Sequence, residues 1–524
     1  MQRWHTEQTS AALNQSEAAC QTPPEGAQTY PGRMVYEAAG ARRDASDAHR
    51  NPYLDLIRVL AIAAVVIGHW IASGVTYKHG KFDGVDVLGV VSWTSWLTLI
   101  FQVVPLFFLV GGYSNALSWT RHQSAGGAAF TWSRRRALRL LIPTATYVAV
   151  VSLAVVASNV AGADHGNLEQ AAWALSLHLW FLAVYLVLLL LTPALLAAHR
   201  RYGVKALAAT TAVAVAIDIG VIEAHWHVVG WVNYVLVWGT FHQLGFAWQD
   251  GFFAGHRGRP LVLTAGAIAA LVALIWWGPY PVSMVGVPGA RIQNASPPSA
   301  ALLAFGFAQV GLVLIAAPSA TRWLARPQRT RLRALIGRAN AMTMPVYLWH
   351  MVPVVLVTVV AYPNHLLAQP SIGSGAWWAQ RIGWIATLTI VLAGVLALVV
   401  LIASALSERP RRPLPRPALP RSAAMVLFGI GVGLSVAALG RLAVQGFAPN
   451  GALDVVTVAG FAGGTLLVVL AGSRDRELVG QSPREQPTAT GQRPANAASA
   501  PPVVVAGRLG LAEPRAPAPP RGAG

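Results

Sequence analysis

The chain of 524 residues contains few charged side chains and a single cysteine. Only 11% of its residues are Asp, Glu, Lys or Arg, against about 25% in an average soluble domain, while 55% are hydrophobic. This composition indicates an integral membrane protein. The lone cysteine, Cys20, excludes an intramolecular disulfide and a cysteine-based metal site. It lies in a polar segment, and we predict no role for it.

The chain also lacks several motifs that would indicate other classes of protein. We find no secretory signal peptide, no phosphate-binding GxxxxGK, no GxSxG elbow and no nucleic-acid module. Acidic residues are scarce, which gives a net charge of +19. Because the basic residues cluster between apolar segments, we expect them to set membrane topology and contact anionic lipid rather than nucleic acid. His225 and His227 indicate a metal only weakly, and we predict no metal site.

Apolar runs of membrane-spanning length recur along the chain. A helix needs about 20 apolar residues to cross a bilayer, and twelve runs approach this length. They predict an all-α fold, a polytopic bundle of transmembrane helices. The runs cover residues 54–75, 90–117, 138–160, 173–198, 204–222, 228–249, 260–278, 299–318, 342–361, 382–406, 423–444 and 452–472.

Basic residues alternate between the predicted loops. Cytoplasmic loops of membrane proteins carry an excess of Lys and Arg. Every second predicted loop is rich in arginine, whereas the loops between them hold little beyond Lys78, Lys81, Arg291 and Arg381. The pattern predicts a multi-pass protein of the plasma (inner) membrane with both termini in the cytoplasm. The basic loops contain Arg134, Arg135, Arg136 and Arg139; Arg200, Arg201 and Lys205; Arg257 and Arg259; Arg322 to Arg338; and Arg409 to Arg421.

Composition divides the chain into five parts. Residues 1–50 and 473–524 are polar or rich in Pro, Ala, Arg and Gly, and we expect them to be disordered cytoplasmic tails. Residues 51–406 are predicted to form a core of ten spans. A Pro/Arg linker at 407–422 precedes two additional transmembrane helices at 423–472.

The last two helices contain glycines at a spacing typical of close helix packing. Gly429 and Gly433 in one helix, and Gly460 and Gly464 in the other, are each separated by three residues. No ionisable residue lies near the centre of either helix. We interpret the pair as a packing appendage that does not contribute to the functional site.

The first apolar run contains three ionisable residues, Asp55, Arg58 and His69. Such groups are costly within a spanning helix and usually mark a functional site. Arg58 and His69 are eleven positions apart, which at about 100° per residue places both on one face, with His69 about 16 Å farther along the axis. Asp55 lies three residues before Arg58, close enough to pair with it. The helix is therefore predicted to direct an acid, a base and an imidazole into the bundle.

A structural interpretation of this helix remains open. Arg58 lies about one turn into the membrane, where its side chain could snorkel to the headgroups. His69 lies near mid-membrane, where snorkelling is difficult, although a neutral histidine hydrogen-bonded across helices would also be stable. The pair together favours a functional site.

Further segments carry two interpretations each. Two glycines in Val104–Tyr113 permit close helix packing or leave room for a ligand. The arginine run from Arg134 to Arg139 would anchor topology, clamp a phosphate, or do both. His178, Trp180 and Tyr185 could form an interfacial aromatic belt. For His350, Asp218 and His242, a structural hydrogen bond is at least as plausible as chemistry.

These motifs together resemble the acyltransferase-3 family of integral membrane acyltransferases, which includes bacterial glycan O-acyltransferases. The match runs in order from about residue 51 to 406. Its segments are Asp55-Leu-Ile-Arg58 followed after ten residues by His69; Pro105-Leu-Phe-Phe108 with Gly112-Tyr113; Arg134-Arg-Arg-Ala-Leu-Arg139 with Pro143; Leu179-Trp-Phe-Leu182; and Val346-Tyr-Leu-Trp-His350. The family often has Ser-Gly where this chain has Gly111-Gly112, so no role of that serine can be carried over.

The resemblance implies an acyltransferase that moves an acyl group, expected to be acetyl, from cytoplasmic acyl-CoA to a hydroxyl of a glycan, glycolipid or secondary metabolite. His69 would act as a general base or carry the acyl group transiently. Arg58, held by Asp55, would bind a donor phosphate or polarise the thioester carbonyl. No permanently bound cofactor is expected; the partners are acyl-CoA, the acceptor and the bilayer. The donor-binding residues would be Arg134, Arg135, Arg136 and Arg139, and the site lining Phe107, Phe108, Gly111, Gly112, Tyr113, Trp180, Tyr347 and His350.

Two rival functions remain. A secondary transporter would use His69, Asp218 and His350 as a proton path, but such proteins usually contain repeated halves, and no convincing repeat is present. A non-catalytic scaffold would depend on neither Arg58 nor His69. The segments 279–298 and 362–380 are the predicted mouth for the acceptor.

Overall fold

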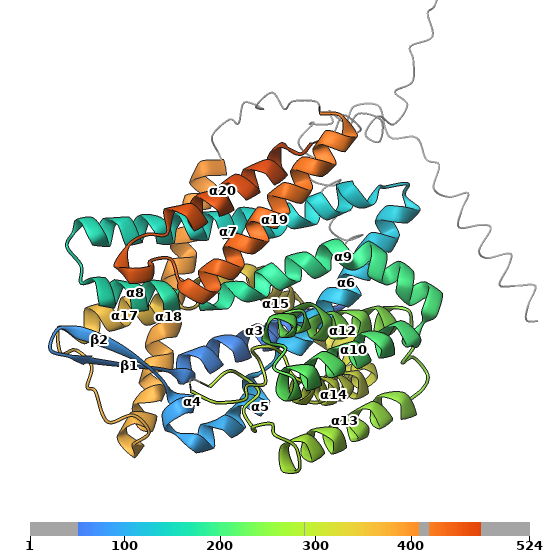
Figure 1. Cartoon of the computed structure of the whole chain (residues 1–524), viewed down its shortest axis with the longest axis horizontal. Helices are drawn as coiled ribbons and strands as arrows, with labels where there is room; N and C mark the ends of the chain where they lie inside the picture. The colour runs from blue at the N-terminus through green and yellow to red at the C-terminus, as the bar shows by residue number, and fades with distance from the viewer. Residues whose placement is uncertain (1–50, 288, 408–418, 473–524) are drawn as a thin grey trace, which may run out of the picture. The chain divides into compact units, whose positions relative to one another are not determined.

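The computed structural model of the chain describes residues 51–287, 289–407 and 419–472 (Figure 1). The predicted tails, with Cys20, and most of the predicted linker lie outside the described residues. The longer helices are α3 (Pro52–Ala72), α6 (Val104–Ser124), α7 (Ala129–Val160), α9 (Trp180–Tyr202), α10 (Val204–Glu223), α12 (Asn233–Gln249), α13 (Gly258–Trp276), α14 (Ala300–Ala325), α18 (Gly375–Ser407), α19 (Arg421–Gln445) and α20 (Val455–Leu470). The shorter elements are β1 (Ser73–Lys78), β2 (Lys81–Asp86), α4 (Val87–Val90), η1 (Ser92–Leu97), α5 (Thr98–Phe101), α8 (His165–Ala174), η2 (Leu177–Leu179), α11 (His227–Gly230), η3 (Pro327–Arg329), α15 (Thr330–Ala341), α16 (Thr343–Trp349), α17 (Val352–Ala361) and η4 (Pro449–Gly451).

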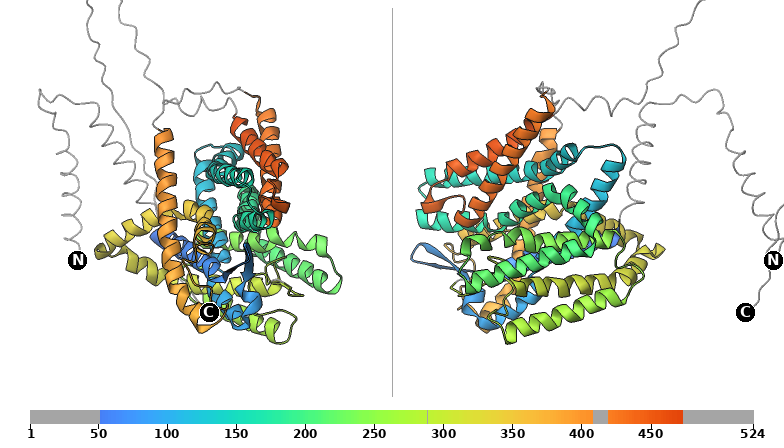
Figure 2. Two further views of the ribbon diagram at one scale, coloured as in Figure 1. Left: turned by 90° about the vertical axis from the view of Figure 1, so that its left-hand side faces the viewer. Right: turned by 45° about the vertical axis from the view of Figure 1, so that its right-hand side comes forward.

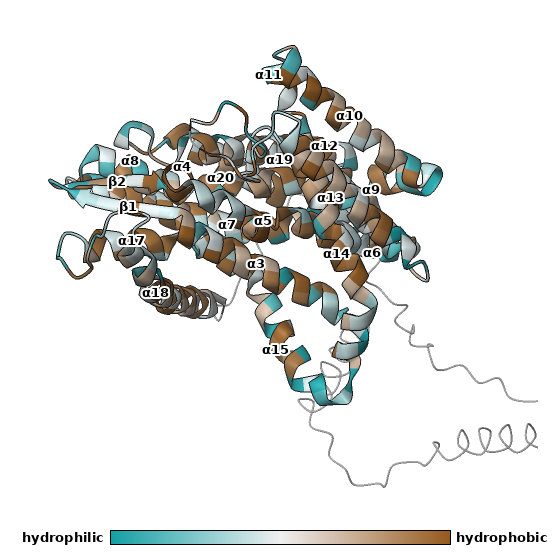
Figure 3. Ribbon diagram, turned by 90° about the horizontal axis from the view of Figure 1, so that it is seen from below, coloured by the Kyte–Doolittle hydropathy of each residue, from teal (hydrophilic) through white to brown (hydrophobic). Residues whose placement is uncertain are grey.

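The predicted all-α polytopic fold is confirmed. Within the described residues, nine helices are long and apolar enough to cross a membrane, and the bent pair α16 and α17 makes a tenth. The other two predicted spans are the shorter helices α12, with 17 residues, and α20, with 16. Much of the helical ribbon is brown, that is apolar, in Figure 3, and many large hydrophobic side chains are exposed, as expected where the surrounding solvent is hydrocarbon.

A β-hairpin follows the first helix, which the sequence analysis did not predict. β1 and β2 pair in antiparallel register from Ser73 opposite Asp86 to Lys78 opposite Lys81. The turn is closed by His79 and Gly80, both with positive φ, a conformation that favours glycine. The hairpin lies close to α8 and α17 in Figures 1 and 3, and Asn167 of α8 accepts a hydrogen bond from the Phe82 backbone at 2.8 Å.

Local sequence explains where the helices of the site begin and break. The Asn51 side chain caps α3 by accepting from the Tyr53 backbone N–H, and Pro52 occupies the first turn, where no N–H partner is needed. Pro353 lies in the first turn of α17 and has no backbone N–H to donate to the Trp349 carbonyl, so the predicted span at 342–361 is broken before it. Its two halves, α16 and α17, meet at an angle of 40° around His350 and Met351.

α3 lies at the centre of the bundle, where it packs against α6, α14, α15 and α16. α6 in turn packs closely on α12, because Gly112 and Gly245 let the two backbones approach. In both views of Figure 2 the blue ribbon of the N-terminal elements lies beside later segments of the chain. The ionisable residues of α3 therefore face protein rather than lipid.

The last two helices pack on each other and on the core. α19 packs on α20 and α9, and α20 also packs on α7. The close approach occurs at Gly431 and Gly464, since a Cβ on either would lie 2.7 Å from the other's carbonyl oxygen. The predicted spacing motif is thus wrong for Gly429, Gly433 and Gly460, where an added Cβ would meet no other described atom within 4 Å.

Candidate functional site

A large cavity of about 1390 Å³ runs through the centre of the bundle, bounded by α3, α6, α7, α9, α17 and the hairpin. Its lining is mostly apolar, with a few polar side chains at defined places. Arg58 and His69 both line it, as expected from their positions on one face of α3. The two residues that the sequence singled out thus open onto one cavity.

Arg58 is held by two side chains. Its Nη1 lies 3.2 Å from Oδ1 of Asp55, the predicted pairing, and its Nη2 donates to the hydroxyl of Ser114 on α6. The Asp55 side chain is 6% exposed and that of Arg58 27%. A buried carboxylate next to the guanidinium offsets its charge and fixes its direction. Arg58 therefore presents a positioned cation to the cavity.

A chain of hydrogen bonds fixes the ring of His69. Its Nδ1 lies 2.8 Å from Nε2 of His350, and Nδ1 of His350 lies 2.8 Å from the carbonyl oxygen of Tyr347. A carbonyl only accepts, so His350 carries its proton on Nδ1 and accepts at Nε2. His69 then donates from Nδ1, and this network assigns a free lone pair to its Nε2. A histidine held in this tautomer is prepared to accept a proton.

His350 can serve as this partner because it lies at the helix break. Because the helix breaks between α16 and α17, the last carbonyl groups of α16 lack the backbone N–H partners of a continuous helix. Nδ1 of His350 donates to one of them, the Tyr347 carbonyl. Its own carbonyl accepts from Trp70 Nε1 at 2.8 Å. The residue is fully buried and lies behind His69 rather than on the cavity wall.

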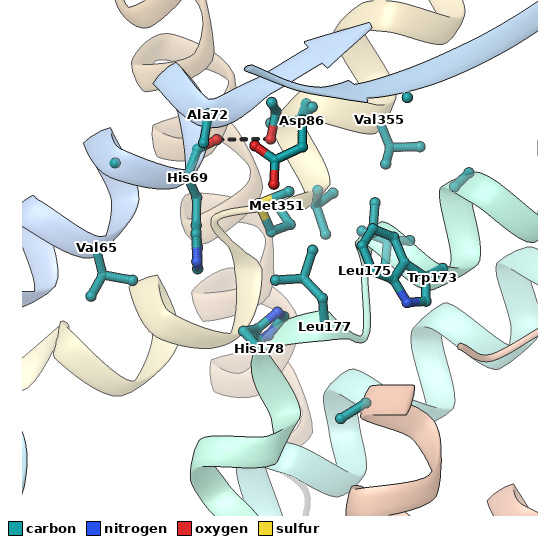
Figure 4. Close-up of a pocket in the computed structure, with 18 of the residues that line it drawn as sticks. Val65, His69, Ala72, Asp86, Trp173, Leu175, Leu177, His178, Met351 and Val355 are labelled. Carbon is teal, nitrogen blue, oxygen red and sulfur yellow. Dashed lines mark hydrogen bonds between the residues drawn. The ribbon is translucent and has the colours of Figure 1, made fainter. Parts of the chain in front are cut away.

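His178 is a third histidine of the same cluster. It is 3% exposed and lines the cavity, so the interfacial-belt interpretation is wrong for this residue. Its ring lies 5.0 Å from that of His350, centroid to centroid, and its carbonyl accepts from the Tyr347 hydroxyl at 2.5 Å. Figure 4 shows His69 and His178 projecting into one cavity.

Asp86 is a site residue that sequence analysis missed. It ends β2, caps α4 by accepting from the Leu88 backbone at 2.9 Å, and directs its carboxylate into the cavity near Met351 (Figure 4). Burial raises the pKa of this carboxyl, while the hydrogen bond from Leu88 lowers it, and the net direction is upward. The sequence did not indicate a function for Asp86, because this residue lies in a predicted loop and the hairpin that directs its side chain was not predicted.

The predicted lining residues divide into two groups. Four of them, Phe107, Gly111, Trp180 and Tyr347, line the cavity. The other four lie behind the wall in the described structure, and their function there is packing: Phe108 stacks on Trp238, Gly112 approaches α12, Tyr113 packs edge-on against Trp248, and His350 holds His69.

The absence of a side chain at Gly111 leaves space for the Tyr185 ring. A Cβ at this position would lie 2.7 Å from the Tyr185 ring and 3.1 Å from its hydroxyl oxygen. A serine therefore does not fit beside Tyr185 as it stands. The Tyr185 side chain beside this position lines the cavity.

The arginine run does not act as one cluster. None of the four arginines is among the described residues that line the cavity. Arg134 is buried and donates to the carbonyl oxygens of Val468 and Val469, at 2.9 and 2.5 Å, so it caps the end of α20. This contact gives Arg134 a structural function, and its contact with the donor stays a prediction. Arg136 bonds Asn115 and Ser118 of α6, whereas Arg135 and Arg139 are exposed.

Asp218 accepts two structural hydrogen bonds. Its Oδ2 accepts from the Tyr280 hydroxyl and from the Ala300 backbone N–H at the start of α14, each at 2.7 Å. It is not part of the described cavity lining. The proton path of the transporter hypothesis therefore lacks its predicted carboxylate at this site.

Comparison with known proteins identifies the family. The model of the acyltransferase-3 family, described as an acyltransferase domain, matches residues 51–404. No curated protein and no solved structure matches the chain. The matched segment contains α3, the broken span α16 and α17, and every side chain of the histidine cluster, and it ends before α19 and α20. The chain belongs to the acyltransferase-3 family and is a membrane acyltransferase.

Proposed function

We propose that the protein transfers an acetyl group from acyl-CoA to a hydroxyl of a glycan, a glycolipid or a secondary metabolite. The observation that carries this proposal is the hydrogen-bond chain from His69 through His350 to the Tyr347 carbonyl. It leaves Nε2 of His69 as an unprotonated base on a cavity that also contains Arg58.

The proposed reaction needs one base and balances without a further reactant. Nε2 of His69 takes the proton of the acceptor hydroxyl as its oxygen attacks the thioester carbonyl carbon. The tetrahedral intermediate then collapses, the carbon–sulfur bond breaks, and its electron pair goes to sulfur. His69 returns the proton to the sulfur, which gives the ester and free CoA thiol.

Helix geometry favours one of the two functions considered for Arg58. Eleven residues of α3 separate it from His69, a rise of about 16 Å. A guanidinium at that distance is far from a thioester held at His69. The phosphates of acyl-CoA are separated from its thioester by the extended pantetheine arm, and Arg58 therefore fits a phosphate of the donor. Asp55 and Ser114 would hold it in place.

Purified protein in nanodiscs tests the proposal. With acetyl-CoA and a hydroxyl acceptor such as dodecyl glucoside, we expect CoA release in the wild type, loss of release in His69→Ala, and no loss in His256→Ala, which changes an exposed loop histidine. Arg58→Ala should raise the KM for acetyl-CoA but not for S-acetyl-pantetheine, which lacks the nucleotide phosphates. Full release in folded His69→Ala would refute the proposed base.

We also propose that the protein lies in the plasma membrane with both termini in the cytoplasm. The arginine-rich loops on alternate sides of the predicted spans support this orientation. In a Cys20→Ser background, a membrane-impermeant maleimide should label Lys78→Cys in intact cells and should not label Arg201→Cys until the membrane is opened. The reverse pattern would invert the topology.

A further inference from the structure

The central cavity continues past His69, away from Arg58, into a chamber between α7 and α17. One stripe of α7 lines it, at spacings of three and four residues: Val150, Val151, Ala154, Val155 and Ser158. Residues three and four apart share one face of a helix. This face of α7 is apolar almost throughout, and it is turned toward the chamber.

α17 contributes a mostly apolar lining. Seven of its ten residues line the same chamber, and the hydroxyl of the one polar residue, Thr358, donates to the Val354 carbonyl. The seven are Val352, Val354, Val355, Leu356, Thr358, Val359 and Val360. α17 packs on α18, while α7 packs on α8, α9 and α20. Figure 4 shows Val355 across the cavity from Leu175 and Trp173 of the α8 end. Two apolar helix faces therefore border an open space.

The chamber opens through the side of the bundle. Val150, Leu356 and Val360 line it, yet they are 46, 45 and 56% exposed. The helices that carry them are long and apolar enough to cross a membrane, α17 as half of the bent pair. Hydrocarbon therefore surrounds this opening. A side chain that is both exposed and cavity-lining here is exposed to lipid.

We propose that the acceptor is a lipid-linked molecule whose hydrocarbon chain enters between α7 and α17 and whose hydroxyl is presented to His69. This inference rests on the proposed function and names its acceptor class. A free glycan would leave its hydroxyls without partners against valine and leucine, which is costly. A hydrocarbon chain meets no such cost.

Two features favour an acceptor chain over a long acyl chain of the donor. A pocket that holds a donor chain needs no opening to the bilayer, whereas an acceptor that resides in the membrane needs an entrance. The donor is placed at the Arg58 end, so the acceptor needs a separate route. Polar side chains of the hairpin and α8, including Asp86, Asn167 and Gln170, border the cavity and are placed to contact the acceptor headgroup.

The experiment uses dodecyl glucoside with a diazirine in its alkyl chain, photolysed with the full-length protein in phosphatidylcholine nanodiscs. We expect mass spectrometry to place the label on the cavity-lining residues of α7 and α17. Excess untagged dodecyl glucoside should displace it, and methyl glucoside should not. Ala154→Trp, which fills the entrance, should reduce this label roughly tenfold. Leu153→Trp is the matched control, because Leu153 is 68% exposed on the same helix but does not line the cavity.

Two results would overturn the inference. Label spread evenly over lipid-facing residues, as with a diazirine phospholipid, would show that no specific chain site exists. Displacement by a non-hydrolysable dodecyl thioether of CoA, but not by untagged dodecyl glucoside, would assign the chamber to the donor.

CoA release, measured in parallel, keeps this test separate from that of the proposed function. His69→Ala should lose CoA release and keep the label. A wild type that takes the label but releases no CoA would refute the proposed reaction while leaving the chain site in place.

Discussion

Replacing His350 by leucine tests the hydrogen-bond chain that prepares His69. Leucine is apolar and cannot accept from Nδ1 of His69, which would then remain without the bond that now spans 2.8 Å. An unpaired buried donor costs about 1–3 kcal/mol. If that cost falls on the reactive tautomer of His69, the rate of acyl transfer should drop about 5- to 150-fold, since 1.4 kcal/mol corresponds to a factor of ten.

The assay is CoA release from acetyl-CoA in the presence of dodecyl glucoside as hydroxyl acceptor, per folded molecule, with folding checked by thermal unfolding in detergent. His350→Gln should recover part of the rate, because its amide oxygen can accept from His69. Trp70→Phe is the control for destabilisation: it removes the hydrogen bond to the His350 carbonyl but leaves the bond to His69. Full wild-type activity in folded His350→Leu would refute the reasoning, and so would equal losses in His350→Leu and Trp70→Phe.

Three further changes separate structural from functional contacts. Arg134→Gln should lower the unfolding temperature, since each lost hydrogen bond to the end of α20 is worth about 1.5–3 kcal/mol. Arg135→Gln, which changes an exposed residue, should leave the unfolding temperature unchanged. Equal unfolding temperatures for the two variants would contradict the capping contact. Gly464→Val should destabilise the α19–α20 pair by about 1–3 kcal/mol through overpacking. Gly460→Val should have little effect on thermal unfolding, because a Cβ at Gly460 meets none of the described neighbouring segments within 4 Å. The pKa of the Asp86 carboxyl is raised in the folded protein. The contribution of Asp86 to the free energy of unfolding is therefore most favourable below its unfolded pKa of about 4, and this contribution is lost as the pH rises through the folded pKa. Asp86→Asn should therefore raise the unfolding temperature at pH 7 more than at pH 4, and a larger gain at pH 4 would show that the sign is wrong.

The sequence was sufficient for features that depend on local periodicity. Apolar runs predicted the helices, and helical spacing predicted the Asp55–Arg58 pair and the shared face of Arg58 and His69. These predictions succeed because helix geometry is nearly invariant: the side-chain direction of a residue follows from its position number.

Contacts between distant segments could not be read in the same way. His69 and His350 are 281 positions apart, and their meeting depends on where a broken helix turns. The α19–α20 contact lies at Gly431 and Gly464 rather than at the predicted glycine pairs, because spacing within one helix does not fix which face meets a partner. The sequence does not distinguish Arg134 from the other arginines of its basic run. Its separate function depends on the packing of α20, whose Val468 carbonyl accepts a hydrogen bond from Arg134.

The arrangement of donor anchor and base on a single helix limits how the proposed enzyme selects its donor. Arg58 and His69 are joined by three turns of unbroken α3, so the distance between them is set by the rise of the helix rather than by a loop that can adapt. A donor must then span that distance between its phosphate and its thioester. No fixed distance of this kind constrains the acceptor, since the chamber between α7 and α17 is open to the bilayer. The site should consequently be strict toward the nucleotide part of the donor and tolerant toward the length of the acceptor chain.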